Sequence, residues 1–167
     1  LGLQSLTGVF PKTKEINISK GRLSLALCIN CSLLQLVNSF DRNEMYGENY
    51  GYMSSLNQSM INHLENKVVN LKKKFDLNYK DIIIDIGSND GTFLSFFGKN
   101  FNLIGVDPTI KKFAGKYNKN IEKVPEFFLP EVVNKYLNKK RAKLITSIAM
   151  FYDLEDPLKF VKDIYEC

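Results

Sequence analysis

A buried strand that runs into a glycine turn constrains this chain more than any other feature. Residues 82–84 are consecutive isoleucines, a β-branched run that is typical of a strand covered on both faces of a parallel sheet. The turn that follows contains Gly87 and Gly91, which tolerate the left-handed backbone of tight turns. A second apolar strand over 103–106 ends at Asp107. Ligands of open α/β sheets bind beyond the carboxyl ends of the strands, so this stretch predicts an α/β fold with a ligand at that edge.

The polar residues of the turn indicate which nucleoside cofactor fits. The dinucleotide fingerprint, G-x-G-x-x-G, has a glycine where this chain has Asn89. Asp85 and Asp90 would also repel the pyrophosphate of a dinucleotide. S-Adenosylmethionine carries a sulfonium, an ammonium and no phosphate, so the same carboxylates favour it. Another nucleotide-binding domain, or an α/β domain whose turn binds nothing, would share the spacing and stays open at this point.

Each residue near the turn has an expected role toward such a cofactor. Asp107 can accept hydrogen bonds from two ribose hydroxyls. Gly87 and Gly91 would let the backbone come close to the ligand, and Asp85 would meet the ammonium group. The candidate cofactor-binding residues of this stretch are Asp85, Gly87, Ser88, Asn89, Asp90, Gly91, Asp107 and Pro108.

Five segments of the chain carry a family resemblance. They occur in the order GRLSLALCINCSLLQL, MYGENYGYMSSLNQSMINH, IGSNDGTFL, GVDP and ITSIAMFYDLEDP. Together they resemble the sugar C-methyltransferase family, which methylates a carbon of a nucleotide-linked keto-deoxysugar. The resemblance covers nearly the whole chain. It implies a class I S-adenosylmethionine-dependent methyltransferase with an N-terminal zinc-binding module and a nucleotide-sugar substrate.

The resemblance extends the candidate site beyond the glycine turn. Tyr52 and Ser54 match a Tyr-x-Tyr-x-Ser-Ser segment that the family carries near the cofactor and the sugar, although turn formation and helix capping would explain them equally. Phe127 matches a region that often contacts adenine, and core packing is its alternative explanation. Ser147 lies near the end of the expected fourth strand, which should face the methionine part of the cofactor. The family's proposed catalytic histidine belongs to a later segment, so His63 is not assigned and the catalytic residues stay unknown.

Cys28 and Cys31 form a CxxC pair, whose two thiolates can bind one tetrahedral zinc ion. A closed structural site needs four ligands. The resemblance implies that this pair is the second of two and that the first lies upstream of this chain, which leaves the zinc site incomplete. Two buried reduced cysteines or a redox pair are the alternatives. Cys167 is distant in the sequence and is not counted as a ligand.

The order of these features predicts the domain organisation. We expect a partial zinc-ribbon-like module over 1–40, a tyrosine-rich loop and linking helix over 41–78, and the N-terminal half of a Rossmann-like, S-adenosylmethionine-binding domain over 79–167. Strands that alternate with helices predict a parallel sheet with the order 3-2-1-4. A class I domain has seven strands, and the chain begins with Leu and ends within a helical pattern, so we expect an incomplete fragment.

The spacing of apolar residues predicts the bounds of the other elements. A stripe at steps of three and four residues predicts a helix over 60–75, capped by Ser55 or Asn57. Further helices are expected over 110–117 and 130–137, a last helix opening at Asp156, and further strands over 121–124 and 144–148.

Composition argues against several other classes of protein. No apolar run reaches the roughly 18 residues of a membrane span, and no signal peptide is visible. Three cysteines, two of them in CxxC, fit a reducing compartment, so a cytoplasmic location is expected. The net charge of +5 includes basic runs at 72–74 and 139–141, which lack interleaved aromatics and predict no nucleic-acid partner. The alternative functions are an NAD(P)-dependent nucleotide-sugar oxidoreductase or epimerase and a non-enzymatic zinc-ribbon binding module.

Overall fold

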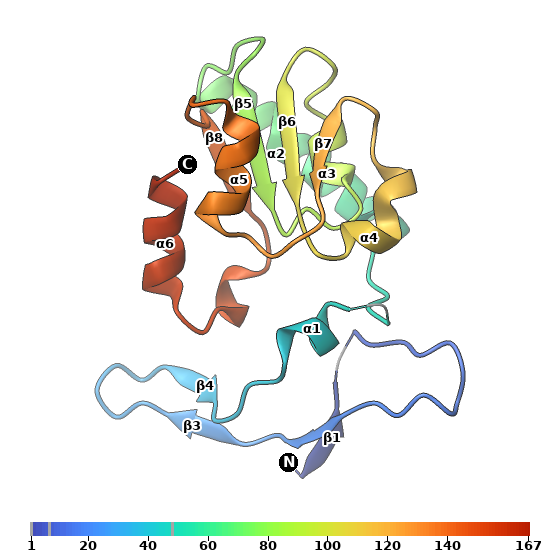
Figure 1. Ribbon diagram of the computed structural model, residues 1–167. Coiled ribbons are helices and arrows are strands. Elements are labelled where there is room, and N and C mark those ends of the chain that lie inside the picture. The colour runs from blue at the N-terminus through green and yellow to red at the C-terminus, as the bar shows by residue number, and fades with distance from the viewer. Residues whose placement is uncertain (1, 7, 48) are drawn as a thin grey trace. The chain divides into compact units, whose positions relative to one another are not determined.

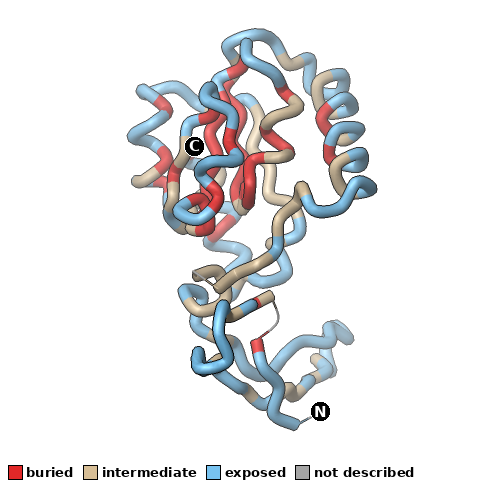
Figure 2. Tube along the Cα trace, turned by 90° about the vertical axis from the view of Figure 1, so that its right-hand side faces the viewer, coloured by how far each residue is buried: buried red, intermediate tan, exposed pale blue. Residues whose placement is uncertain are grey.

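The computed structural model describes residues 2–6, 8–47 and 49–167, and the chain divides into two compact units, Leu1–Tyr52 and Met53–Cys167. Most of the buried residues belong to the second unit, where they follow the strands of its sheet (Figure 2). The second unit therefore holds the hydrophobic core of the fold.

The first unit contains two small antiparallel sheets, in which β1 pairs with β2 and β3 pairs with β4. Helix α1 begins after Asp41, whose side chain accepts hydrogen bonds from the amides of Asn43 and Glu44. Leu6 and Val9 are the buried apolar residues among those described in this unit. With so few buried residues this unit has little core of its own, and two-stranded sheets are only marginally stable alone. Its elements are β1 (Leu3–Ser5), β2 (Lys20–Arg22), β3 (Leu25–Leu27), β4 (Leu34–Leu36) and α1 (Arg42–Met45).

The second unit is built on a four-stranded parallel sheet with the order β7-β6-β5-β8 (Figure 1). All five residues of β5 are buried, as the β-branched run predicted. The order confirms the predicted 3-2-1-4 arrangement, and it brings the carboxyl ends of the four strands to one edge of the sheet. The strands are β5 (Ile82–Ile86), β6 (Asn102–Val106), β7 (Ile121–Val124) and β8 (Leu144–Ser147).

Helices cover both faces of this sheet (Figure 1). Helices α2 and α3 pack with Ile83 and Leu103 on one face, while α5 and α6 pack with Ile84 and Ile104 on the other. Successive residues of a strand point to opposite faces, so both faces of β5 and β6 contribute to the core. No helix in the described ranges is long and apolar enough to cross a membrane. The helical elements are η1 (Ser54–Leu56), α2 (Gln58–Lys74), α3 (Thr92–Ser95), α4 (Ile110–Phe113), η2 (Ala114–Lys116), α5 (Pro130–Leu137), η3 (Phe151–Asp153) and α6 (Pro157–Tyr165).

Helix α2 begins at one of its two predicted caps. The Asn57 side chain accepts a hydrogen bond of 2.8 Å from the amide of Ser59. Leu64 and Val68 are buried against the sheet, as the apolar stripe predicted. Phe75 continues the stripe in the sequence but is 42% exposed, because the helix ends before it. Leu71 also packs against this core, so the stripe contributes up to the last turn of the helix.

Three segments differ in detail from the predicted elements. The helix expected over 110–117 changes after Phe113 into the 3-10 turn η2, where Gly115 weakens an α-helix. Strand β8 ends at Ser147, because the backbone turns left-handed at Ala149. The tyrosine-rich loop contains α1 and η1, and Asp41 supplies the cap that starts α1.

Adjacent valines on α2 test how far the packing of this helix stabilises the unit. Val68 is 1% exposed and Val69 is 44% exposed. We expect Val68→Ala to lower the free energy of unfolding by about 2–3 kcal/mol, since it removes two buried methyl groups and leaves a cavity. Val69→Ala should leave stability unchanged or raise it slightly, because alanine has the higher helix propensity. Urea denaturation of the two variants measures this, and equal losses would contradict the packing described.

Candidate functional site

The turn between β5 and α3 lies at the carboxyl edge of the sheet. The amide of Gly87 donates a hydrogen bond of 2.8 Å to the carbonyl of Val106, the last residue of β6. Gly87, Asn89 and Gly91 all have left-handed backbone, with φ of 75°, 52° and 78°. Asn89 occupies the position where a dinucleotide fingerprint has glycine, and asparagine is among the residues that adopt this conformation most readily. The backbone therefore follows a glycine-like path while carrying an amide side chain.

Asp107 fixes this turn to the neighbouring strand. One carboxylate oxygen, Oδ2, accepts a hydrogen bond of 2.8 Å from the amide of Asn89. The other, Oδ1, accepts from the amide and the hydroxyl of Thr109, at 2.7 and 2.6 Å. A carboxylate offers about four acceptor positions, and three are used within the protein. Of the two ribose hydroxyls that were expected to bind Asp107, the carboxylate has room for one.

The side chains of Asn89 and Asp90 hold the segment before α2. The amide of Ser54 donates to Asn89 Oδ1 at 2.9 Å, and the amide of Ser55 donates to Asp90 Oδ2 at 3.0 Å. Asp90 Oδ1 also accepts from the hydroxyl of Thr92 at 2.7 Å. Asp90 is 2% exposed, so its side chain serves the fold rather than an open surface. The structure thus brings Ser54 against the turn, and its expected place near the cofactor stays a prediction.

Tyr117 packs against the turn between β5 and α3 and supports it through hydrogen bonds. Its role was not identified from the sequence. Its hydroxyl lies 2.7 Å from Ser88 Oγ and donates a hydrogen bond of 2.9 Å to the carbonyl of Asn89. A Cβ added to Gly91 or to Gly105 would lie within 2.9 Å of the tyrosine ring. Both glycines therefore make room for this ring. Burial raises the pKa of the Tyr117 phenol, which stays protonated. The glycine within strand β6 was the sequence signal of such a close approach.

Asp85 and Ser147 present polar atoms without partners at the same edge. Thr146 Oγ1 donates to Asp85 Oδ1 at 2.7 Å, while no described residue hydrogen-bonds to Asp85 Oδ2. Ser147 Oγ is buried and has no hydrogen-bond partner within the described ranges. Strands β5 and β8 pair Asp85 with Thr146 and Ile86 with Ser147, so the side chains of Asp85 and Ser147 lie on opposite faces of the sheet near its carboxyl edge. A buried hydroxyl without a partner is rare, so Ser147 Oγ indicates a place for a ligand or an ordered water molecule.

Burial also changes the titration of Asp85. The side chain is 3% exposed, and removal from water raises its pKa from 3.8 to about 7. The hydrogen bond from Thr146 lowers the pKa, and the nearby carboxylate of Asp107 raises it. Asp85 is therefore close to half ionised at neutral pH. A cation bound beside it would favour the ionised form.

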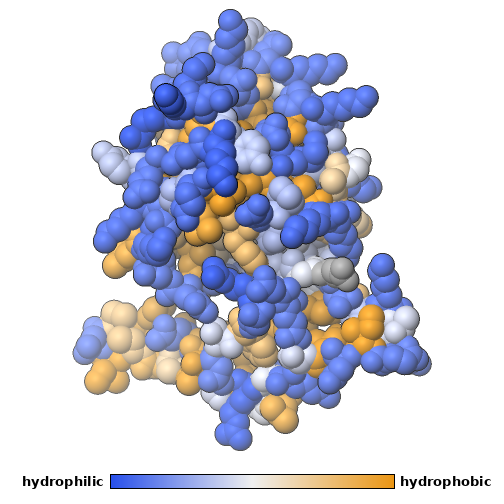
Figure 3. Space-filling model, in the orientation of Figure 1, coloured by the Kyte–Doolittle hydropathy of each residue, from blue (hydrophilic) through white to orange (hydrophobic). Residues whose placement is uncertain are grey.

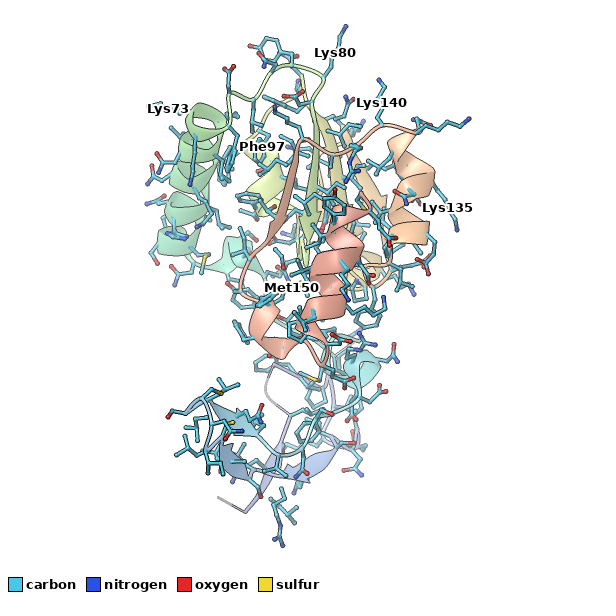
Figure 4. The ribbon with its side chains drawn as sticks, turned by 90° about the vertical axis from the view of Figure 1, so that its left-hand side faces the viewer. Lys73, Lys80, Phe97, Lys135, Lys140 and Met150 are labelled. Carbon is cyan, nitrogen blue, oxygen red and sulfur yellow. The ribbon has the colours of Figure 1, made fainter. Side chains whose placement is uncertain are left out.

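Protein side chains cover the faces of both turn glycines. A Cβ added to Gly87 would lie 3.1 Å from Met150 Sδ, and Tyr117 covers Gly91 as described above. Figure 4 shows Met150 at the end of the unit where this turn lies. From the sequence, both glycines are expected to let the backbone come close to a ligand, and this stays a prediction. In the structure, the space that a side chain at either glycine would need is taken by Met150 and Tyr117.

The remaining predicted residues occupy different places. Ser88 is buried in the turn, and Pro108 follows Asp107 half-buried. Phe127 is half-buried in the segment after β7, at the same edge of the sheet. Tyr52 belongs to the first unit and is 44% exposed. His63 is exposed on α2.

Cys28 and Cys31 lie in the loop between β3 and β4. The amide of Ser32 donates to the carbonyl of Cys28, and the amide of Cys28 donates to the carbonyl of Leu33, both at 2.9 Å. The backbone amides of Cys31 and Asn30 lower the pKa of the Cys28 thiol, which favours the thiolate. In the part of the chain that the structure describes, however, no three metal-ligating side chains come together. The loop supplies two ligands and does not by itself fit a closed zinc site.

Comparison with known proteins shows the family to which this chain belongs. A family model described as a methyltransferase domain matches residues 52–167. The chain belongs to this methyltransferase domain family. The C-methyltransferase NovU of Streptomyces niveus is 30% identical to it over 112 residues, which cover 66% of this chain and 26% of NovU. The chain thus spans about a quarter of the length of this curated relative.

Membership of this family implies S-adenosylmethionine as the methyl donor. The residues present fit that molecule. Asp85 Oδ2 lacks a hydrogen-bond partner among the described residues, and an ammonium group could donate to it. The remaining acceptor position of Asp107 suits one hydroxyl. No basic side chain among the described residues hydrogen-bonds to these carboxylates, so a cationic ligand meets no competing charge.

We expect Tyr117→Phe to lower the free energy of unfolding by about 1–2 kcal/mol. The ring stays in place, but the Asn89 carbonyl and the Ser88 hydroxyl lose a buried partner. Tyr79→Phe is the matched control, since Tyr79 is 71% exposed and its hydroxyl has no hydrogen bond to a described residue. Urea denaturation with circular dichroism measures both variants. Equal stability of Tyr117→Phe and the wild-type chain would count against a supporting role for the phenol.

Asp85 should make stability depend on pH. Its pKa is raised on folding, so its contribution is fully present below about pH 4 and is lost as the pH rises through about 7. We expect wild-type stability to fall over this window by up to about 4 kcal/mol relative to Asp85→Asn. The exposed variant Asp76→Asn should follow the wild-type curve. Thermal denaturation from pH 4 to 8 measures this, and parallel curves for wild type and Asp85→Asn would refute it.

Proposed function

We propose that this chain binds S-adenosylmethionine at the carboxyl edge of its sheet and takes part in transferring the methyl group to carbon. Membership of the methyltransferase domain family supports this, as does the similarity to the C-methyltransferase NovU. One observation carries the proposal. Asp85, which is 3% exposed at the carboxyl edge of the sheet, has a carboxylate oxygen without a hydrogen-bond partner among the described residues.

The chain's own residues would bind and orient the donor. S-Adenosylmethionine supplies an electrophilic methyl group on a sulfonium. Ionised Asp85 would accept a hydrogen bond from the ammonium group, and Ser147 would offer its hydroxyl to the donor at the end of β8. Asp107 would accept one ribose hydroxyl, and Phe127 would pack against the adenine. The turn residues Gly87, Ser88, Asn89, Asp90 and Gly91, together with Pro108 and Ser54, would form the wall of the site.

We further propose a nucleotide-linked keto-deoxysugar as the acceptor. The family resemblance of the sequence supports this substrate. A ketone makes the neighbouring C–H acidic, and a general base that removes its proton creates the carbon nucleophile. His63 is exposed on α2 and is not assigned as that base. Tyr52 stays a candidate for contacts with the sugar or the cofactor.

The charge of the edge favours this proposal over a dinucleotide-dependent oxidoreductase. Asp85, Asp90 and Asp107 are all at most 8% exposed and lie around one turn. A pyrophosphate there would face three carboxylates without a compensating base among the described residues, which is costly in a dry site. A sulfonium and an ammonium are stabilised by the same groups.

We also propose a zinc site and a cellular location, on the basis of the family resemblance and the composition. Cys28 and Cys31 would act as two of the four ligands of a zinc site, with the thiolate of Cys28 favoured by its lowered pKa. The three cysteines of the chain are free thiols, which supports a cytoplasmic location. Neither point affects the roles assigned to the carboxyl edge of the sheet.

Calorimetric titration with S-adenosylmethionine and, separately, with NAD tests the cofactor proposal. We expect saturable binding of S-adenosylmethionine, about tenfold weaker in Asp107→Asn because that variant loses a charged acceptor. Asp81→Asn, the same change directly before β5, is the matched control and should bind like wild type. Circular dichroism confirms folding of each variant.

The pH dependence of binding gives a second measurement. Affinity for S-adenosylmethionine should rise between pH 6 and 8 in the wild-type chain, as Asp85 ionises, and stay flat in Asp85→Asn. Binding of NAD without binding of S-adenosylmethionine by the folded chain would overturn the proposal.

A further inference from the structure

A second cleft opens at the opposite end of the same sheet, where the strands begin. Its volume of about 610 Å³ falls within the range of small-ligand sites. Asn102, the first residue of β6, lines it, while Asp107 follows the last residue of that strand. At about 3.3 Å per residue the two positions are roughly 16 Å apart. The cleft is therefore separate from the candidate cofactor site.

Positive charge gathers around this cleft. Four lysines from different segments line it, and Glu122 is the only acidic residue among the described lining residues. The side-chain ammonium groups of these four lysines make no ion pair or hydrogen bond with a described residue. Figure 3 shows hydrophilic residues over this end of the unit, and Figure 4 shows Lys140 and Lys80 at the end away from Met150. The lining lysines are Lys99, Lys119, Lys135 and Lys140.

Local structure explains only part of this charge. Lys135 lies in the last turn of α5, where a cation stabilises the helix dipole. Lys99 and Lys119 lie in loops that lead into β6 and β7, and no helix ends beside either of them. Like charges that converge without partners repel each other, so the fold gains nothing from them. A bound anion would remove that repulsion.

Hydrogen bonds hold the loops that carry these lysines. The side-chain amide of Asn120 donates to the carbonyl of Gly98 at 3.3 Å, which joins the loop of Lys119 to the loop of Lys99. The amide of Lys80 donates to the carbonyl of Asn100 at 2.9 Å. The rim of the cleft is therefore formed before any ligand binds, which lowers the entropic cost of binding.

We infer that this cleft binds a small anion with several phosphate groups, such as inorganic triphosphate or a nucleoside triphosphate. Lysine is a common phosphate ligand, and four positive charges against one negative match such an anion. Tyr136 lines the cleft and is 37% exposed, so it offers one ring for a base. A single exposed ring does not form the series of stacking platforms of a nucleic-acid groove. The site does not depend on the proposed methyl-transfer function.

Calorimetric titration of the full chain with inorganic triphosphate tests the inference. We expect saturable binding that Lys99→Gln/Lys119→Gln weakens by tenfold or more. Lys73→Gln/Lys111→Gln removes the same charge from exposed positions outside the cleft and should change the affinity less than twofold. Equal weakening by both double variants, or no binding at millimolar concentration, would overturn the inference. Circular dichroism establishes that each double variant is folded.

Further titrations identify the ligand and show where it binds. If ATP binds more tightly than triphosphate and Tyr136→Ala removes the difference, the ligand is a nucleoside triphosphate. Equal affinities for ATP and triphosphate indicate that the cleft recognises the phosphate chain alone. Either result supports the site. A short RNA that binds more tightly than both would overturn the small-anion assignment. Competition between triphosphate and S-adenosylmethionine would overturn a separate site. Because triphosphate binding is measured without S-adenosylmethionine, failure of one proposal leaves the other unaffected.

Discussion

One buried carboxylate organises the edge of the sheet on which the candidate site depends. Asp107 connects the end of β6 to the turn after β5 through the amide of Asn89, and to the start of α4 through Thr109. An unpaired buried amide costs about 1–3 kcal/mol, so this carboxylate removes a substantial penalty. The same edge leaves few atoms for a ligand: one acceptor position on Asp107, one oxygen of Asp85 and the hydroxyl of Ser147. Because these atoms are few, a ligand must match both their charge and their positions.

Much of the second unit could be predicted from the sequence because its signals are local. Strand β7 and helix α5 have the predicted bounds. Pro130 at the first position of α5 explains why the start of that helix could be predicted. The sheet order follows from the alternation of strands and helices. Asp85, Asp107 and Ser147 lie at one edge because parallel strands end together. Local pattern and topology thus determine which residues can meet.

Contacts between distant segments could not be predicted in the same way. Thr146 reaches Asp85 only through the register of β8 on β5. Met150 covers Gly87 because the chain turns back after β8. Tyr117 follows a helix that was expected to include it, so its sequence position did not indicate a role below the turn. Each of these contacts depends on tertiary packing, which periodicity does not encode.

The fit of one ring over two glycines has an evolutionary consequence. The Tyr117 ring occupies the space that side chains at Gly91 and Gly105 would need. A mutation that enlarges either glycine meets the ring, and a smaller residue at 117 leaves a void below the turn. Intermediates that change one position alone are therefore disfavoured. In descendants of this chain the three positions should be inherited as a set, so that the interior of the sheet restricts how the turn above it can diverge.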